Sequence, residues 1–222
     1  MTDITILFED GEALVIDKPA GLPIERPRAG GRSLEDHLED LKLGFQRVPV
    51  PVHRIDTDTS GCLLLARNPK ALKRFNAAFE AREVDKVYLG VVAGTLDQDE
   101  GTIELSLAKI SSAEKGWRMI PAKKGKPAVT HWRKLAVHDG RTLVEFRPET
   151  GRTHQIRVHA LADLGHALLG DPVYGDGRGA PRTMLHALAL TVHREGKPPI
   201  EARAPMPADF AALGFSDHAS GG

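Results

Sequence analysis

Five strand-like segments follow one another through the middle of the chain with only short turns between them. They cover residues 87–92, 102–107, 117–121, 128–137 and 142–147, and glycine, lysine and aspartate mark the turns. Strands that come in runs, instead of alternating with helices, favour an antiparallel sheet over a doubly wound parallel one. The sequence therefore predicts an α+β fold with a mixed, mainly antiparallel sheet and flanking helices.

Helices are expected where capping residues precede an apolar repeat. Asn68 is followed by Pro69 and then by apolar residues at helical spacing, which predicts a helix that begins at this proline. Ser33 is a second N-cap candidate, for a short helix. Residues 153–164 also have helical spacing, with Thr153 as the expected cap.

Composition sets the class of protein. The 222 residues are 41% hydrophobic and 27% charged, as expected of a folded chain. The chain contains no run of eighteen apolar residues, so no membrane span is expected. The first ten residues lack the basic start of a secretory signal. A single cysteine excludes an internal disulfide. We expect a cytoplasmic protein with one catalytic domain over residues 1–215 and a disordered tail over residues 216–222.

Charge is balanced over the whole chain but not along it. The formal net charge is zero, which argues against a protein that coats nucleic acid. Residues 114–134, however, contain a single acid, Glu114. The bases in this stretch are Lys115, Arg118, Lys123, Lys124, Lys126, Arg133 and Lys134. Such a local patch can bind phosphates, although a solvated lysine loop would have the same composition.

One polar loop runs directly into an apolar strand. It reads His53-Arg54-Ile55-Asp56-Thr57-Asp58-Thr59-Ser60-Gly61 and precedes Cys62-Leu63-Leu64-Leu65. An acid two residues from an arginine suits an ionised carboxylate that acts as a nucleophile or base. The same residue types also suit an ordinary turn.

Two more clusters contain candidate functional residues. Arg152, His154, Gln155 and Arg157 surround a predicted helix start, where free N–H groups favour an anion. A zinc site is less favoured here, because the two nearest histidines are five residues apart instead of four. Tyr88 lies in a predicted strand and has a side chain that can stack on a flat ring.

The motifs together resemble the RluA family of RNA pseudouridine synthases. His53-Arg54-Ile55-Asp56 with Thr59-Ser60-Gly61 resembles that family's signature. The order of further motifs also agrees: Ile6-Leu7-Phe8-Glu9-Asp10, Val15-Ile16-Asp17-Lys18-Pro19-Ala20-Gly21-Leu22, Lys86-Val87-Tyr88, Thr150-Gly151-Arg152-Thr153-His154-Gln155-Ile156-Arg157-Val158-His159, Gly170-Asp171-Pro172-Val173-Tyr174-Gly175 and Leu185-His186-Ala187.

The resemblance implies that the chain isomerises uridine to pseudouridine in RNA, without a metal, a nucleotide or a redox cofactor. Asp56 matches the catalytic aspartate, Tyr88 the tyrosine against the uracil ring, and Arg157 the basic partner of the aspartate. Arg54 matches a residue able to fill the space left by the extruded base. His53, Arg152, His154, Gln155, Lys123 and Lys124 are the further RNA-binding candidates.

Several expectations stay open at this point. The opening motif begins at residue 6, so we expect no N-terminal S4-type domain, and RNA selection then falls to the basic segment. The partner is expected to be ribosomal or transfer RNA, as a stem-loop, with a monomeric enzyme as the default. The alternatives are a noncatalytic RNA-binding module on the same fold and a glycoside or nucleoside hydrolase that pairs Asp56 with a second acid, a position for which spacing alone leaves Asp58 open.

Overall fold

The computed structural model describes residues 4–112, 114 and 116–216. The chain forms two compact units, unit 1 from Met1–Lys86 and Ala187–Pro205, and unit 2 from Val87–His186 and Met206–Gly222. The predicted single domain over residues 1–215 stays a prediction. Of the tail predicted for residues 216–222, all but Ser216 lies outside the described residues.

Unit 1 is built on strands in the order β1-β2-β4-β10, with β3 paired to β4 and β11 paired to β10. The pairs β1–β2, β2–β4, β3–β4 and β10–β11 are antiparallel. Every residue of β4 is buried, and this strand lies between β2 and β10 in the sheet order. The bounds are β1 Ile6–Glu9, β2 Ala13–Lys18, β3 Val50–Pro51, β4 Ser60–Ala66, β10 Leu185–Val192 and β11 Ile200–Arg203.

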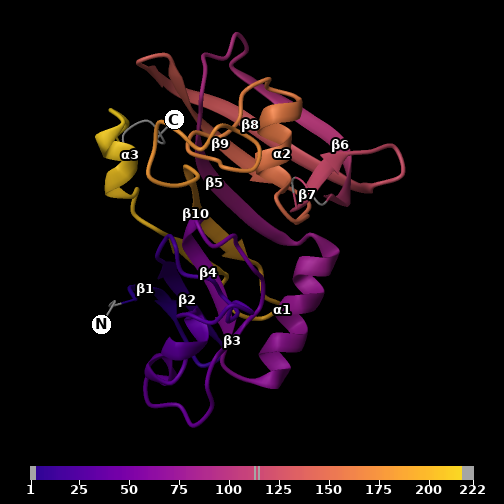
Figure 1. Cartoon of the computed structure of the whole chain (residues 1–222). Helices are drawn as coiled ribbons and strands as arrows, with labels where there is room; N and C mark the ends of the chain where they lie inside the picture. Colours follow the sequence, from indigo (N-terminus) through magenta and orange to yellow (C-terminus); the bar gives the residue numbers. More distant parts are fainter. Residues whose placement is uncertain (1–3, 113, 115, 217–222) are drawn as a thin grey trace. The chain divides into compact units, whose positions relative to one another are not determined.

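The main helix of unit 1 begins where the sequence predicts. α1 covers Pro69–Ala81, and the Asn68 side chain accepts a hydrogen bond from the Ala71 N–H at 2.9 Å. It lies against β4 (Figure 1). The short helix predicted after Ser33 is instead two 3-10 turns, η1 at Leu34–His37 and η2 at Asp40–Lys42.

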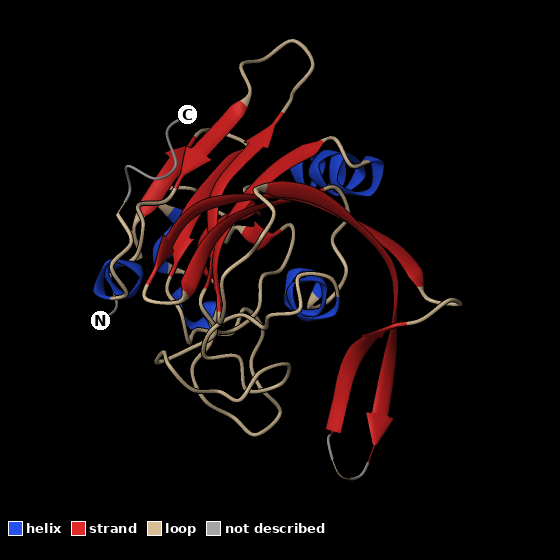
Figure 2. Ribbon diagram, turned by 90° about the horizontal axis from the view of Figure 1, so that it is seen from above, coloured by secondary structure: helices blue, strands red, loops and turns tan. Residues whose placement is uncertain are grey.

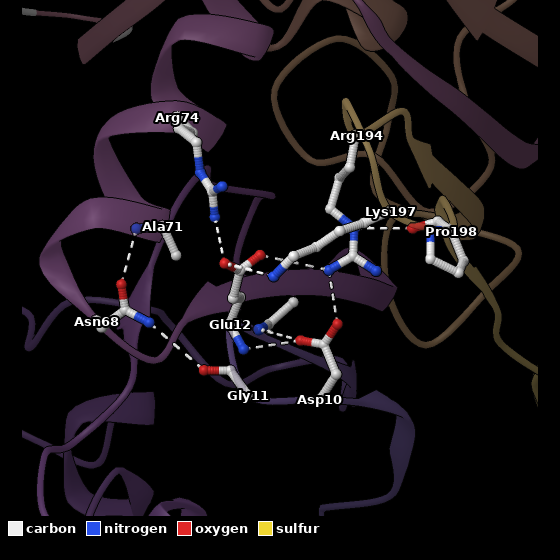
Figure 3. A network of polar contacts seen from close by, with 10 residues as sticks. Asp10, Gly11, Glu12, Asn68, Ala71, Arg74, Arg194, Lys197 and Pro198 are labelled. Carbon is white, nitrogen blue, oxygen red and sulfur yellow. Dashed lines mark hydrogen bonds and ion pairs between the residues drawn. The ribbon is translucent and has the colours of Figure 1, made fainter.

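A charged network joins the β1–β2 turn to α1 and to the β10–β11 connection. The Glu12 carboxylate forms ion pairs with Arg74 at 2.6 Å and with Lys197 at 2.9 Å, and Asp10 forms an ion pair with Arg194 at 2.6 Å (Figure 3). We call these five residues the Glu12 cluster. Its ion pairs connect segments that are far apart in the sequence.

Unit 2 contains an antiparallel sheet in the order β5-β9-β8-β6-β7. β6 and β7 extend as a two-stranded arm at one end of this order (Figure 2). The bounds are β5 Val84–Val92, β6 Glu100–Ser112, β7 Gly116–Pro121, β8 Lys126–His138 and β9 Arg141–Pro148. The predicted α+β fold with a mainly antiparallel sheet is confirmed.

Helix α2 covers one face of this sheet and covers fewer residues than predicted. It begins at Gln155 and ends at Ala162, and it contacts β6, β7 and β8 (Figure 1). Ile156 and Ala160 pack into an apolar cluster with Val144 and Phe146 of β9.

The predicted cap of α2 is wrong. His154, and not Thr153, is the N-cap, and its backbone is left-handed with φ of 53°. The sequence pattern also missed α3 at Ala208–Ala212, which is too short to show helical spacing. Among residues 4–112, 114 and 116–216, no helix is both long and apolar enough to cross a membrane.

Candidate active site

The residues of the polar loop before β4 differ in their exposure to solvent. Arg54 is exposed, Asp56 and Asp58 are half-buried, and Thr59 and Ser60 are buried. The Thr59 N–H donates to the Asp56 carbonyl at 3.0 Å, which closes a turn immediately after the candidate aspartate. The carboxylate of Asp56 is therefore carried by a short, internally bonded loop.

A fully buried lysine, Lys18, holds this loop through hydrogen bonds to backbone carbonyls. Lys18 has no exposed surface, and its Nζ donates to the carbonyls of Pro19 and Leu22 at 2.8 Å and of Thr57 at 3.0 Å. The Gly21 N–H donates to the same Thr57 carbonyl at 2.9 Å. Because a buried cation is costly unless its donors are satisfied, these bonds hold the backbone next to Asp56 in one position.

Gly61 explains why the loop motif ends in glycine. Its φ is +103°, a value that other residues rarely adopt. A Cβ at this position would also overlap the backbone of Ala187. The loop therefore enters β4 through a turn and a close backbone approach that no other residue allows.

His53 holds the start of the loop. Its Nε2 accepts the Leu64 N–H at 3.0 Å, and its ring stacks on Phe79 with centroids 4.8 Å apart. Burial, with a smaller contribution from the Lys86 charge, lowers the pKa of His53 to about 3. A neutral ring that accepts a backbone hydrogen bond has a structural role, and the predicted RNA contact of His53 stays untested.

Arg157 is held by a carboxylate, Asp171, for which the sequence motifs predict no role. Arg157 binds Asp171 through two hydrogen bonds, Nε to Oδ2 at 2.7 Å and Nη2 to Oδ1 at 2.8 Å. Arg157 is 7% exposed and Asp171 is fully buried. We call these two residues the Asp171 pair.

Asp171 is itself held in place by backbone donors. Its Oδ1 accepts the N–H groups of Val173 at 2.8 Å and Tyr174 at 3.1 Å. Burial raises the pKa of Asp171, but hydrogen bonds and charge from Arg157, followed by the backbone bonds, outweigh it and lower the pKa overall. The carboxylate stays ionised and fixes the orientation of the arginine, whose guanidinium also lies over the Tyr174 ring at 5.1 Å.

Gln155 is buried and fully engaged with the protein. Its Oε1 accepts from Thr150 Oγ1 at 2.7 Å and from the Arg152 N–H at 3.0 Å, and its Nε2 donates to the Val129 carbonyl and Thr130 Oγ1 at 2.9 Å. These four bonds use the whole amide. Gln155 therefore fastens the loop before α2 to β8, and its predicted RNA contact stays untested.

The remaining candidates of unit 2 lie around the same sheet. Tyr88 on β5 is half-buried, pairs with Phe146 of β9, and packs against the apolar cluster that contains Ile156. Arg152 donates from Nε to the Pro127 carbonyl at 3.1 Å. Lys123 and Lys124 are exposed in the turn between β7 and β8.

The candidate catalytic residues fall in both units. Asp56 belongs to unit 1, whereas Tyr88 and Arg157 belong to unit 2. The pairing of Asp56 with Arg157 therefore stays a prediction. Within the described part of the chain, no group of three histidine, cysteine or acidic side chains is arranged to hold a metal ion.

Sequence reasoning assigned no role to Lys18, Asp171 or Tyr174. One signal could have found Asp171, because an arginine on the buried side of a short helix needs a carboxylate partner. Lys18 gave no such signal, since a lysine at the end of a strand usually reaches solvent.

Comparison with known proteins identifies the family. Residues 12–162 match the RNA pseudouridylate synthase family. The chain is 53% identical over 212 residues to an uncharacterized RNA pseudouridine synthase of Zymomonas mobilis, covering 95% of this chain and 97% of that protein. It is 37% identical over 195 residues to ribosomal large subunit pseudouridine synthase D of the same organism, covering 84% of this chain and 61% of that protein.

A solved structure agrees with this result. The human protein RNA pseudouridylate synthase domain containing 1 superposes with a TM-score of 0.76 at 29% identity, covering 92% of this chain and 84% of that one. The resemblance drawn from the motifs is confirmed. The chain belongs to the RNA pseudouridylate synthase family and is an enzyme that isomerises uridine to pseudouridine in RNA.

Proposed function

We propose that the isomerisation depends on the carboxylate of Asp56. The N1–C1′ bond of the target uridine breaks, the uracil turns, and a C5–C1′ bond forms while C5 loses its proton and N1 gains one. Asp56 either attacks the sugar or assists the cleavage. The observation that carries this proposal is the rigid placement of Asp56 on a loop whose Thr57 carbonyl is held by Lys18 and Gly21.

Tyr88 and Arg157 complete the proposed catalytic set. Tyr88 packs against the uracil ring and takes part in removing the C5 proton. Arg157 uses Nε and Nη2 for Asp171, so Nη1 lies on the other edge of the planar guanidinium. We assign Nη1 to the Asp56 carboxylate, where the positive charge would keep the acid ionised and oriented.

RNA is expected to bind through exposed cations. The target base must leave its stack, at a cost of about a few kcal/mol, and the exposed Arg54 is suited to fill the gap. The exposed Lys123 and Lys124 are proposed to contact the RNA in unit 2, together with the half-buried Arg152 and His154 through the parts of these side chains that stay accessible. We leave His53 and Gln155 out of this set, because Nε2 of His53 accepts a backbone hydrogen bond and the whole Gln155 amide is bonded within the protein.

Ribosomal RNA is the first substrate to test. Several relatives are named ribosomal large subunit pseudouridine synthase D, among them proteins of Zymomonas mobilis and Nitrosomonas europaea. A transfer RNA stem-loop is the second candidate. We propose that the enzyme acts as a cytoplasmic monomer and needs no metal or cofactor, because the reaction involves no redox change and no external group.

The test is release of tritium from RNA labelled at uracil C5. Purified protein should release tritium, and Asp56→Asn should reduce the release to the background rate. Asp58→Asn is the matched control, since it changes an acid two residues away that is also half-buried, and it should retain activity. Mapping pseudouridine in large-subunit ribosomal RNA and in transfer RNA after incubation then identifies the substrate.

Two results would contradict the mechanism. Free uracil as a product would mean hydrolysis instead of isomerisation. Full activity of Asp56→Asn, with Asp58→Asn impaired, would move the reactive carboxylate to Asp58.

A further inference from the structure

Trp117 is a large aromatic side chain left in solvent. The chain has two tryptophans. Trp132 on β8 is 5% exposed and belongs to the apolar core of unit 2, whereas Trp117 on β7 is 46% exposed. Tryptophan is among the costliest side chains to leave in water, because its burial removes the most apolar surface. The exposed indole is therefore a candidate for contact with another molecule.

The Trp117 ring rests on a stack of aromatic side chains. His154 lies against it with centroids 4.9 Å apart and an interplanar angle of 28°. His154 meets the Tyr174 ring edge-on at 5.6 Å, and its Nδ1 is 3.0 Å from the Tyr174 hydroxyl. That hydroxyl also accepts the Met119 N–H of β7 at 2.9 Å.

These contacts make the indole rigid before any ligand arrives. The His154 ring is held by its contact with the Tyr174 hydroxyl, and the Tyr174 backbone is held in turn by its N–H bond to Asp171. A ring held in advance binds a flat partner with little further loss of side-chain entropy. The arrangement suits a stacking platform more than a flexible surface residue.

The charge around Trp117 selects the chemistry of the partner. The exposed Lys109 of β6 places its ammonium 4.7 Å from the indole centroid. Arg118 is the next residue of β7, and its side chain points to the opposite face of the strand. Lys123, Lys124 and Lys126 lie beyond the far end of β7, in the next turn and at the start of β8. A flat ring beside a cation, on an arm whose next turn carries further exposed lysines, complements a base that is attached to phosphates.

The Lys109 ammonium does not prevent stacking. An exposed cation–π contact is worth about 0.5–1 kcal/mol, whereas stacking of a base on an aromatic side chain is worth about 1–3 kcal/mol. A base can therefore replace the ammonium over the ring, and the lysine then reaches a phosphate of the same strand.

We propose that Trp117 is a stacking platform for an unpaired base of the substrate RNA, other than the uridine that is isomerised. This rests on the proposed function in that RNA is the substrate. Bases within a double helix have both faces covered, so the platform favours a loop, bulge or single-stranded end over a continuous duplex. It therefore adds selection for unpaired RNA beside the target.

The experiment uses tryptophan fluorescence. The protein with Asp56→Asn, which we expect not to turn over, is titrated with an RNA stem-loop and with a fully paired duplex of the same stem. Because Trp132 is buried, quenching on RNA binding reports on Trp117. The stem-loop should quench the fluorescence strongly and the duplex weakly, and Trp117→Phe should abolish the quenching.

Affinity gives the second readout. Trp117→Ala should weaken binding of the stem-loop about 5- to 150-fold, which is the stacking free energy of about 1–3 kcal/mol expressed as a ratio of dissociation constants. Trp117→Tyr should restore most of the affinity. Val137→Ala is the matched control, since Val137 is 47% exposed on β8 of the same unit, and it should bind like the parent.

The outcomes separate this proposal from the mechanism. Unchanged affinity of Trp117→Ala, or equal quenching by stem-loop and duplex, overturns the platform even when the wild-type enzyme releases tritium. Loss of affinity in Trp117→Ala with retention in Trp117→Tyr and Val137→Ala supports it. That result stands even if Asp56→Asn proves active and the catalytic assignment fails.

Discussion

Each unit contains a carboxylate bound by cations, and the two clusters differ in their contact with water. In the Glu12 cluster, the side chains of Arg74 and Lys197 are 45% and 48% exposed around a carboxylate that is 18% exposed. In the Asp171 pair, the side chains are 8% and 0% exposed. The Glu12 carboxylate has two half-solvated partners from different elements and the buried Arg194 at 3.6 Å, whereas the Asp171 carboxylate has one arginine, bound at two points, and backbone donors.

The difference in solvent exposure indicates that the Glu12 cluster and the Asp171 pair have different roles. Partly exposed ion pairs lose little solvation and are weak one by one, so a network that joins a turn, a helix and a strand connection serves mainly to hold the fold. A buried pair loses solvation on both sides, and an apolar replacement is often as stable. The Asp171 pair is therefore best explained by its effect on Arg157, which it holds in a single orientation.

The largest effect is expected when the Asp171 pair is broken. Asp171→Ala leaves a buried guanidinium without its carboxylate and should lower the free energy of unfolding by about 3–5 kcal/mol. Asp171→Asn keeps the shape and one acceptor, so it should fold but release tritium more slowly, because Arg157 loses its orientation. Urea unfolding and tritium release measure the two effects. An Asp171→Asn enzyme with wild-type activity would show that the pair serves stability alone.

A pH titration tests whether the α2 region is as dry as the Asp171 pair suggests. His159 on α2 is fully buried, neither ring nitrogen has a hydrogen-bond partner among the described residues, and burial lowers its pKa to about 4. The unfolded chain, with a histidine pKa of about 6.5, binds the proton first. Stability should therefore be complete above about pH 6.5 and fall by about 1.4 kcal/mol per pH unit as the pH drops toward 4.

The matched variant is His159→Leu, which loses no hydrogen bond. Urea unfolding at several pH values should show a slope that is smaller by one proton across this window. Some slope should persist, because His53 of unit 1 also has a lowered pKa, of about 3. An unchanged slope in His159→Leu would mean that the ring is hydrated in solution.

Local patterns predicted the fold well where neighbours in sequence decide it. Asn68 and Pro69 mark the start of α1, and turn residues separate the strands of unit 2. The start of α2 was misplaced because Gln155 bonds to Val129 and Thr130 on β8. Tertiary bonds of this kind leave no trace in helical spacing.

The candidate site was predictable from motifs only in part. The loop around Asp56 and the presence of Arg157 follow from the residues themselves. The support beneath them does not, because Lys18 reaches a carbonyl 39 residues away and Arg157 reaches a carboxylate 14 residues away. Such contacts depend on how strands and loops return to one another, which one sequence does not specify.

A smaller effect is expected for the Glu12 cluster. Glu12→Gln removes the charge that attracts Arg74 and Lys197 but keeps a side chain of the same shape. The free energy of unfolding should fall by about 1 kcal/mol, as for partly exposed pairs, and tritium release should not change. Reduced release at full stability would mean that this network also has a part in catalysis, which would remove the distinction between the two clusters.

The smallest effect, and the sharpest comparison, is the response to salt. The Debye length falls from about 10 Å at 0.1 M to about 3 Å at 1 M salt. The coupling between Glu12 and Arg74, measured by a double-mutant cycle with Glu12→Gln and Arg74→Gln, should be a few tenths of a kcal/mol at low salt and vanish at high salt. The cost of Asp171→Asn should be the same at both, because no ions enter the buried pair. Equal salt sensitivity would mean that water reaches Asp171, and the case for a sealed, orienting carboxylate would then be lost.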